Sequence, residues 1–128
     1  VRKSTEGAEH MPLVSVLRSD GSDSGLAFHG VPGGHEFTSF IMGLYNVAGP
    51  GQALDGETMG RIKALDAPTD MQIFVSLSCT MCPELVIAAQ HIAALNPNVR
   101  TEAYDLNHFP ALKETYNVMS VPLSLIHI

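Results

Sequence analysis

The sequence predicts an α/β fold. Short runs rich in apolar and β-branched residues alternate with segments whose apolar residues recur at helical spacing, and the predicted order is β-β-α-α-β-α-β-α-β. The chain has 128 residues, of which 45% are hydrophobic and only 16% are charged. This size suits one domain, and this apolar content excludes a disordered chain.

The first half predicts a hairpin followed by a helix. Residues 11–18 contain a short apolar run, residues 19–25 are rich in Ser, Asp and Gly, and residues 26–29 return as a second strand. A helix is predicted over 35–48, and the Gly-Pro-Gly sequence at 49–51 ends it. Its apolar residues at helical spacing are Phe37, Phe40, Ile41, Leu44 and Ala48.

The second half predicts alternating strands and helices after a hinge. A shorter helix is predicted over 57–65, and Asp66-Ala67-Pro68-Thr69 is the best candidate boundary. The later predicted elements are a buried strand at 71–77, a helix at 83–95, a strand at 99–104, a short helix from Pro110 to Tyr116 and an apolar strand at 123–128.

Charge and composition exclude several classes of function. Thirteen acidic and seven basic residues give a net charge of -6, whereas nucleic acids and anionic membrane surfaces attract basic faces. No apolar run reaches the roughly 18 residues that a membrane-spanning helix needs. Two cysteines are too few for a disulfide-stapled secreted scaffold, and the first residues form no apolar signal segment, so we expect a cytoplasmic protein.

The strongest chemical motif is Cys79-Thr80-Met81-Cys82, between a predicted strand and a predicted helix. Two cysteines at this spacing can close a small disulfide ring, and the helix dipole and N-terminal amides stabilise a thiolate on the first of them. Pro83 suits the first turn of a helix, which does not need its missing N–H. We therefore expect Cys79 to be the exposed nucleophile and Cys82 the shielded resolving thiol.

Two other interpretations of the dithiol remain open at this point. Zinc sites also use this spacing, but they usually need a second pair of ligands, and the sequence has no further Cys and no His-x-x-x-His pair. The two cysteines could also be buried structural residues.

Val121-Pro122 is the second motif, about forty residues after the dithiol and just before a predicted strand. In thioredoxin-like folds a cis-proline occupies this place, against the active disulfide. The alternative is an ordinary trans-proline that opens an edge strand. Together with the dithiol, the position favours the cis form.

Longer segments resemble a known family. Residues 28–40 (Phe-His-Gly-Val-Pro-Gly-Gly-His-Glu-Phe-Thr-Ser-Phe) and 75–83 (Val-Ser-Leu-Ser-Cys-Thr-Met-Cys-Pro) resemble the N-terminal domain of the alkyl hydroperoxide reductase flavoprotein, known as its F subunit. Leu95-Asn96-Pro97 and Met119-Ser120-Val121-Pro122 fit as well. The resemblance covers nearly the whole chain.

The resemblance implies two thioredoxin-like (glutaredoxin-like) folds in tandem. Residues 1–52 would then be the C-terminal half of a first unit that has lost its dithiol, and residues 53–68 a connector helix and hinge. Residues 69–128 would be most of a second unit that carries the C-x-x-C motif and is truncated at its C-terminus.

The resemblance also implies a function, that of a disulfide oxidoreductase. Its second unit relays electrons from a thioredoxin-reductase-like module, which uses FAD and NAD(P)H, to the peroxiredoxin subunit in peroxide detoxification. We expect no FAD or nicotinamide in this segment, because it contains no G-x-G-x-x-G motif. We expect the whole protein to be a homodimer.

The resemblance assigns a role to Glu36 as well. In the family the acid of the Gly-His-Glu-Phe motif faces the dithiol, where it would move protons or raise a thiol pKa. From the residues alone, Glu36 is an exposed acid in the first turn of a helix, where the helix dipole favours it.

Two further functions stay open. The chain could be a free-standing protein disulfide oxidoreductase, or a non-catalytic module that docks a peroxiredoxin. The dithiol discriminates between them, since a pure docking module need not keep it.

Both ends are expected to be cuts in a longer protein. The chain starts at Val1 without an initiator Met, and residues 123–128 (Leu-Ser-Leu-Ile-His-Ile) look like the translation of a transposon end used in sequencing libraries. The alternative for residues 123–128 is a native apolar strand.

Overall fold

The computed structural model describes residues 10–128 of the chain. Its strands are β1 (Leu13–Leu17), β2 (Asp23–His29), β3 (Thr69–Val75), β4 (Val99–Asp105) and β5 (Leu123–His127). Its helices are α1 (Glu36–Ala48), α2 (Gly56–Lys63), α3 (Cys82–Leu95) and α4 (Pro110–Thr115). The α/β class and the predicted order of elements are confirmed, with boundaries that differ by a few residues.

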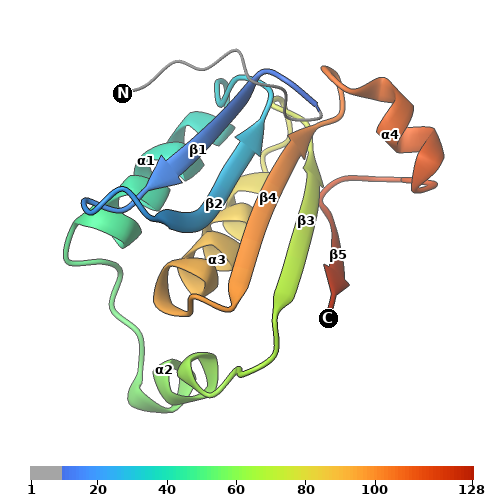
Figure 1. Ribbon diagram of the computed structural model, residues 1–128. Helices are drawn as coiled ribbons and strands as arrows, with labels where there is room; N and C mark the ends of the chain where they lie inside the picture. Colours follow the sequence, from blue (N-terminus) through green and yellow to red (C-terminus); the bar gives the residue numbers. More distant parts are fainter. Residues whose placement is uncertain (1–9) are drawn as a thin grey trace.

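The strands form one sheet in the order β1-β2-β4-β3-β5 (Figure 1). β2 and β3 both run parallel to β4, while the edge strands β1 and β5 run antiparallel to their neighbours. Because α1 follows β2 and α3 follows β3, both helices begin at the carboxyl ends of parallel strands. The two helices therefore start at the same end of the sheet, and they lie together behind it (Figure 1).

The main core lies between the sheet and α3. Alternate residues of β3 and β4, such as Ile73, Val75 and Ala103, face Val86 and Ala89 of α3, and all are buried. This alternation follows from the two-residue period of a strand. The core fixes α3, and with it the dithiol, against the centre of the sheet.

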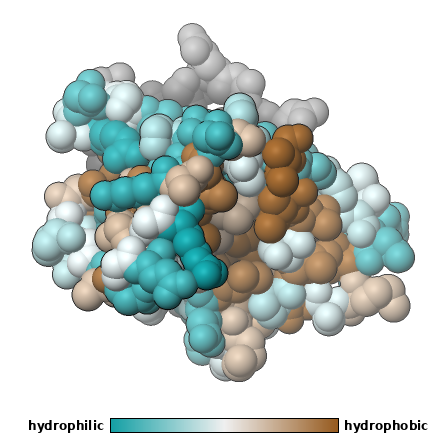
Figure 2. All heavy atoms as spheres, turned by 90° about the horizontal axis from the view of Figure 1, so that it is seen from below, coloured by the Kyte–Doolittle hydropathy of each residue, from teal (hydrophilic) through white to brown (hydrophobic). Residues whose placement is uncertain are grey.

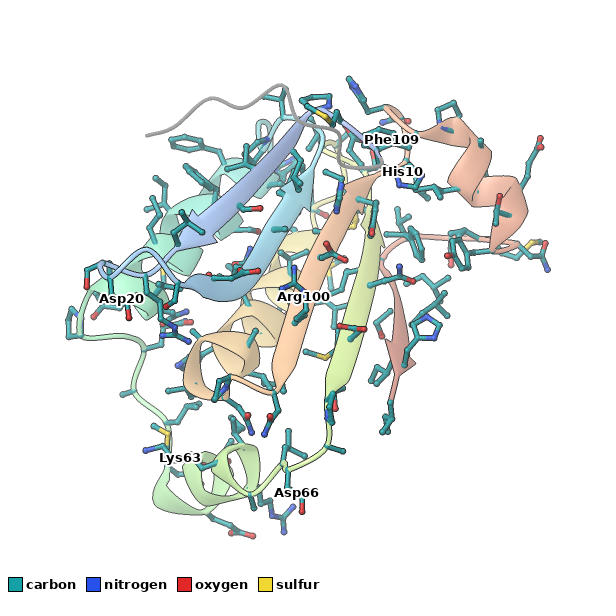
Figure 3. All side chains as sticks on the ribbon, viewed as in Figure 1. His10, Asp20, Lys63, Asp66, Arg100 and Phe109 are labelled. Atoms are coloured by element: carbon teal, nitrogen blue, oxygen red, sulfur yellow. A yellow bond between two sulfur atoms is a disulfide. The ribbon has the colours of Figure 1, made fainter. Side chains whose placement is uncertain are left out.

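The opposite face of the sheet packs against α4. Phe74 and Tyr104 contact Leu112 and Val118 there. The ring of His29 stacks on Tyr104 with a centroid separation of 4.2 Å, and next to this pair the His10 and Phe109 rings lie 5.3 Å apart (Figure 3). These contacts hold the segment that leads into α4.

The helix α1 buries a different face from the one that its apolar spacing marks. Phe37 and Ile41 are 56% and 45% exposed, whereas Glu36, Ser39 and Gly43 are buried. Small residues at the contact let α1 approach α3 closely. Phe37, Ile41 and Leu44 are consequently left on the surface, while Phe40 and Val47 are partly buried.

No helix within residues 10–128 is both long enough and apolar enough to cross a membrane.

Candidate active site

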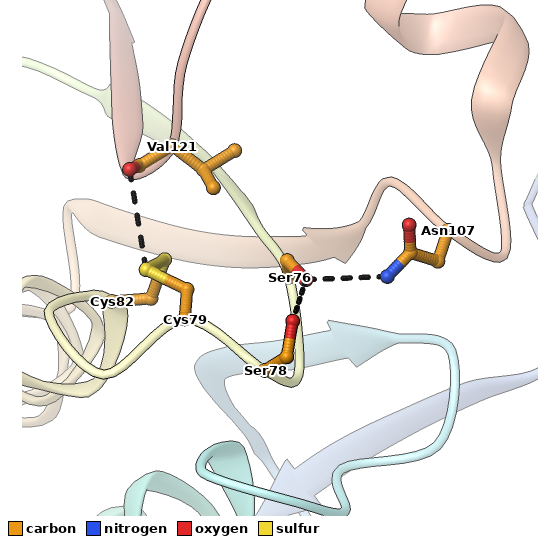
Figure 4. Close-up of a disulfide and its surroundings, with 6 residues drawn as sticks. All are labelled: Ser76, Ser78, Cys79, Cys82, Asn107 and Val121. Atoms are coloured by element: carbon orange, nitrogen blue, oxygen red, sulfur yellow. Dashed lines mark hydrogen bonds between the residues drawn. A yellow bond between two sulfur atoms is a disulfide. The ribbon is translucent and has the colours of Figure 1, made fainter.

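Cys79 and Cys82 are joined by a disulfide at the start of α3 (Figure 4). Their Cα atoms are 5.5 Å apart. Cys82 is the first residue of α3 and is fully buried, whereas Cys79 lies in the preceding turn and is partly exposed. Pro83 occupies the first turn of the helix, as the sequence predicts. The arrangement gives the two sulfur atoms unequal access to solvent.

The cis-proline segment lies beside this disulfide. The Val121–Pro122 peptide bond is cis, and the Val121 carbonyl oxygen lies 4.0 Å from the Cys79 sulfur (Figure 4). The structure thus brings the Val121–Pro122 peptide next to Cys79, although Val121 and Cys79 are 42 residues apart in the sequence. In the reduced state this carbonyl is placed to accept a hydrogen bond from a thiol at Cys79.

A small polar network, which the sequence does not predict, supports the turn before Cys79. The backbone N–H of Cys79 donates to the Ser76 carbonyl at 3.0 Å, and the Ser76 and Ser78 hydroxyls are 3.0 Å apart. Asn107, which follows β4, donates from its side-chain amide to the Ser76 hydroxyl at 3.2 Å. Polar residues just after two adjacent parallel strands are the signal that could have indicated it.

A hollow of about 380 Å³ opens next to the cis-proline segment. Ser76 and Asn107 line one side, and Met119, Ser120 and Val121 line another. Met119 is 86% exposed at its rim. The space is large enough for an amino-acid side chain, and Val121, whose carbonyl lies beside Cys79, forms part of its wall.

Glu36 is the first residue of α1, and its side chain is 0% exposed. The interpretation of Glu36 as an exposed acid is therefore wrong. Burial raises the pKa of the Glu36 carboxyl, although Ser39 and His35 act in the opposite direction. A buried carboxyl whose pKa is raised holds a proton more readily than an exposed one, which is the property that a proton-transfer group needs.

The start of α1 is anchored directly to the segment that precedes the dithiol. The backbone N–H of His35 donates to the Leu77 carbonyl at 2.9 Å. Gly34 has a φ of +53°, and a Cβ there would lie 2.7 Å from the same carbonyl oxygen. Only glycine fits this approach. Glu36 therefore directly follows two residues, Gly34 and His35, that contact Leu77, and Leu77 precedes the turn that contains Cys79.

The glycine-rich loop before α1 does not fit a phosphate group. The amides at the start of α1 are already used, because the backbone N–H of His35 donates to the Leu77 carbonyl, that of Glu36 to Gly33, and that of Phe37 to Gly34. The carboxyl of Glu36 at the helix start adds a group that an anion avoids. Among residues 10–128, no three His, Cys, Asp or Glu side chains gather in a way that could hold a metal ion.

Comparisons with known proteins match this geometry. A family model described as "Thioredoxin domain" matches residues 69–127. The F subunit of alkyl hydroperoxide reductase in Pseudomonas aeruginosa is 37% identical over 118 residues, which are 92% of this chain and 23% of that protein. The chain therefore spans about a quarter of the length of this relative.

Two solved structures are also similar. The F subunit of alkylhydroperoxide reductase in Enterococcus faecalis is 44% identical with a TM-score of 0.89, over 93% of this chain and 57% of that one. A protein disulfide oxidoreductase from Aeropyrum pernix is 26% identical with a TM-score of 0.79, over 93% of this chain and 51% of that one. The chain therefore has a thioredoxin-like fold, and over nearly its whole length it is homologous to part of the F subunit of alkyl hydroperoxide reductase.

Proposed function

We propose that this chain is a thiol–disulfide electron relay. It passes reducing equivalents from a thioredoxin-reductase-like module, which uses FAD and NAD(P)H, to a peroxiredoxin in peroxide detoxification. The observation that carries the proposal is the Cys79–Cys82 disulfide at a helix N-terminus, with the Val121 carbonyl beside the outer sulfur. The similarity to the F subunit of alkyl hydroperoxide reductase supports the peroxide-reducing context.

The forward half of the relay starts from the dithiol. The Cys79 thiolate attacks one sulfur of the peroxiredoxin disulfide, a mixed disulfide forms, and the other partner sulfur leaves as a thiolate that takes a proton from solvent. Cys82 then gives its thiol proton to the Glu36 carboxylate and attacks Cys79. This step restores the Cys79–Cys82 bond and releases the second partner thiolate, so that the peroxiredoxin gains two electrons.

The return half recharges the dithiol. A thiolate of the flavin module attacks Cys79, Cys82 leaves and takes the proton that Glu36 holds, and the second thiol of the module releases Cys79. Partial exposure of Cys79 and full burial of Cys82 support this division of roles. The helix N-terminus stabilises a thiolate on Cys79.

FAD and NAD(P)H belong, in this proposal, to a module outside the segment described here. The backbone amides of His35, Glu36 and Phe37 at the start of α1 are occupied, which argues against a dinucleotide phosphate at that helix start. The same proposal divides the chain at residues 52 and 68, as the tandem arrangement implies, and places it in a cytoplasmic homodimer.

A second candidate is a free-standing protein disulfide oxidoreductase. The similarity to the Aeropyrum pernix protein favours it. The third, a non-catalytic docking module, has less support, because the chain keeps two cysteines in position to form a disulfide.

The three candidates differ in which disulfides the chain reduces. The prereduced chain, freed of dithiothreitol, is mixed in equal amounts with an oxidised bacterial peroxiredoxin or with insulin. A relay reduces the peroxiredoxin much faster than insulin, a general oxidoreductase reduces both, and a docking module reduces neither. Cys79→Ser is the control for dithiol dependence. Equal rates with the two substrates would contradict the relay.

A further inference from the structure

The hollow beside the cis-proline segment is rich in hydrogen-bond donors that are free within residues 10–128. Three consecutive backbone N–H groups of its wall, those of Met119, Ser120 and Val121, donate no backbone hydrogen bond there. The Ser120 side chain is exposed on the same wall. On the other side, the Asn107 amide donates one N–H to the Ser76 hydroxyl, and its second N–H remains. Such a wall is suited to groups that accept hydrogen bonds.

Lys113 adds a positive charge to these donors. It lies in the last turn of α4, it is exposed, and it is the one charged residue among the described residues that line the hollow. Its ammonium group forms no ion pair within residues 10–128. An ammonium group offers three N–H donors and no acceptor, whereas an ionised carboxylate only accepts. A cation and several free donors around one hollow therefore favour a carboxylate as the occupant.

The hollow lies within reach of a peptide that is bound at the dithiol. Val121 forms part of its wall, and the Val121 carbonyl oxygen is 4.0 Å from the Cys79 sulfur. A mixed disulfide places the Cα atom of the partner cysteine about 5.5 Å from that of Cys79. Each further residue of an extended peptide adds about 3.3 Å. A side chain one or two residues from the partner cysteine can therefore enter the hollow.

We propose that this hollow is a specificity subsite for an acidic side chain, a Glu or Asp within two residues of the reacting cysteine of the disulfide partner. Lys113 and the free N–H groups of residues 119–121 bind its carboxylate. This proposal rests on the proposed function, since it concerns the partner of Cys79. The chain has a net charge of -6, so an acidic partner gains no general attraction from it. Recognition of the acid therefore depends on this local site.

Matched peptides that carry one cysteine joined to 2-thiopyridine test this subsite. The Cys79 thiolate of the prereduced chain attacks the peptide sulfur, and the leaving thiolate takes a proton and is measured as pyridine-2-thione. Cys82 then loses its proton, attacks Cys79 and releases the peptide thiolate. The peptides have amidated C-termini and carry Glu, Gln or Lys two residues before or after the cysteine. Below saturation, we expect the better Glu peptide to react about threefold to fivefold faster than its Gln counterpart, and the Lys peptide to react slowest.

Variants of Lys113 assign this preference to the hollow. Lys113→Met keeps the length of the side chain, so it should reduce the preference for Glu to less than about twofold and leave the rate with the Gln peptide unchanged. Lys113→Arg should retain the preference, and Lys113→Glu should make the Lys peptide the fastest. Lys63→Met is the matched control and should change none of the rates. Lys63 is an exposed lysine in the last turn of α2, at the other end of the sheet from α4 (Figure 1).

The preference should also weaken as the salt concentration rises, because Lys113 is exposed and salt screens its attraction for a carboxylate. Equal rates with the Glu and Gln peptides in the unmodified chain would overturn the subsite, and so would a preference that Lys113→Met leaves intact. A Gln peptide with a free C-terminal carboxylate that reacts faster than the Glu peptides would overturn the assignment to a side chain. Lack of thione release from every peptide would instead refute the dithiol function, on which the subsite depends.

Discussion

Glu36 links the proposed chemistry of this site to the stability of the fold through one buried carboxyl. It is fully buried at the start of α1, and its two oxygens have no hydrogen-bond partner within residues 10–128. Burial of such a group usually costs about 1–3 kcal/mol. The fold therefore keeps a destabilising residue at the same end of the sheet as the dithiol.

The cost of Glu36 depends on pH in a defined direction. Its pKa in the folded chain is raised above the ordinary value of 4.5, so the folded state holds a proton that the unfolded state loses. The free energy of unfolding should then fall as pH rises from 4.5 to the folded pKa, by about 1.4 kcal/mol for each unit of pKa elevation. Glu36→Gln should remove this dependence. The variant should therefore become increasingly stable relative to the unmodified chain as pH rises over this range.

Urea unfolding of both proteins at several pH values between 4.5 and 8 measures this difference. A constant difference between the two proteins over the range would show that the Glu36 pKa is not raised. The remaining titratable groups serve as the internal reference, because they are the same in both proteins.

The two cysteines should differ in reactivity after reduction. Cys79 is partly exposed before the helix, whereas Cys82 is buried inside it. Iodoacetamide near pH 7 should therefore label Cys79 at least about 10-fold faster than Cys82, since thiolate character and access set the rate. Cys82→Ser should accumulate mixed disulfides and Cys79→Ser should not. Peptide mapping by mass spectrometry gives the order, and equal labelling would contradict the assigned roles.

At the scale of elements, the sequence predicts the existence of α1 better than its orientation. Helical spacing at Phe37, Ile41 and Leu44 correctly indicates a helix, but these side chains are 38–56% exposed. Apolar spacing does not reveal which face a neighbouring helix can approach. Here α1 approaches α3 at Ser39 and Gly43. The Glu36 carboxyl is buried because it lies on the same face of the helix.

The dithiol, in contrast, was predictable from the sequence, because its interactions are local. Cys79 and Cys82 interact with each other over three residues, and a strand and a helix with an early proline fix their place locally. Asn107 and Ser76 contact each other across 31 residues, and nothing in the local sequence pairs them. Short-range chemistry is readable from a sequence, whereas this long-range hydrogen bond depends on the packed sheet.

The role of the turn before α1 can be tested by comparing Gly34, which lies in this turn, with Gly60, which lies in α2. Gly34→Ala should destabilise the chain by at least about 1–2 kcal/mol, because an alanine at a positive φ is strained and its Cβ would meet the Leu77 carbonyl. Gly60→Ala, inside α2 with open space around it, should instead stabilise by up to about 1 kcal/mol. Thermal melts of both variants give the comparison. A neutral Gly34→Ala would mean that α1 is not anchored through this turn.

At the scale of the whole molecule, hydrophobic residues remain on the surface. In the space-filling view from below, brown hydrophobic residues gather next to a teal, polar area (Figure 2). Other exposed hydrophobic side chains lie along α1, where Phe37, Ile41 and Tyr45 are all more than 40% exposed. Contiguous apolar surface of this kind favours self-association.

The exposed face of α1 should bind a hydrophobic dye without contributing to stability. Replacing Phe37 and Ile41 together by Gln should reduce the fluorescence of bound anilinonaphthalene sulfonate and change the free energy of unfolding by less than about 1 kcal/mol. As the contrasting variant, Phe28→Ala removes a 4% exposed core side chain and should cost about 3–5 kcal/mol. A large loss of stability in the double variant would show that this face is covered.

The single sheet also decides how this protein can be dissected. A piece cut at Pro68 would begin with β3 and would leave β4, paired with β2 along Leu26–His29, as a bare edge. The same cut would remove Leu26 and Phe28 from the layer that packs on α3, together with the Glu36 carboxyl. A shortened version made for crystallisation or for a biosensor should therefore retain the β1–β2 hairpin and α1, because a shorter piece would lack both the wall of its core and the buried Glu36 carboxyl.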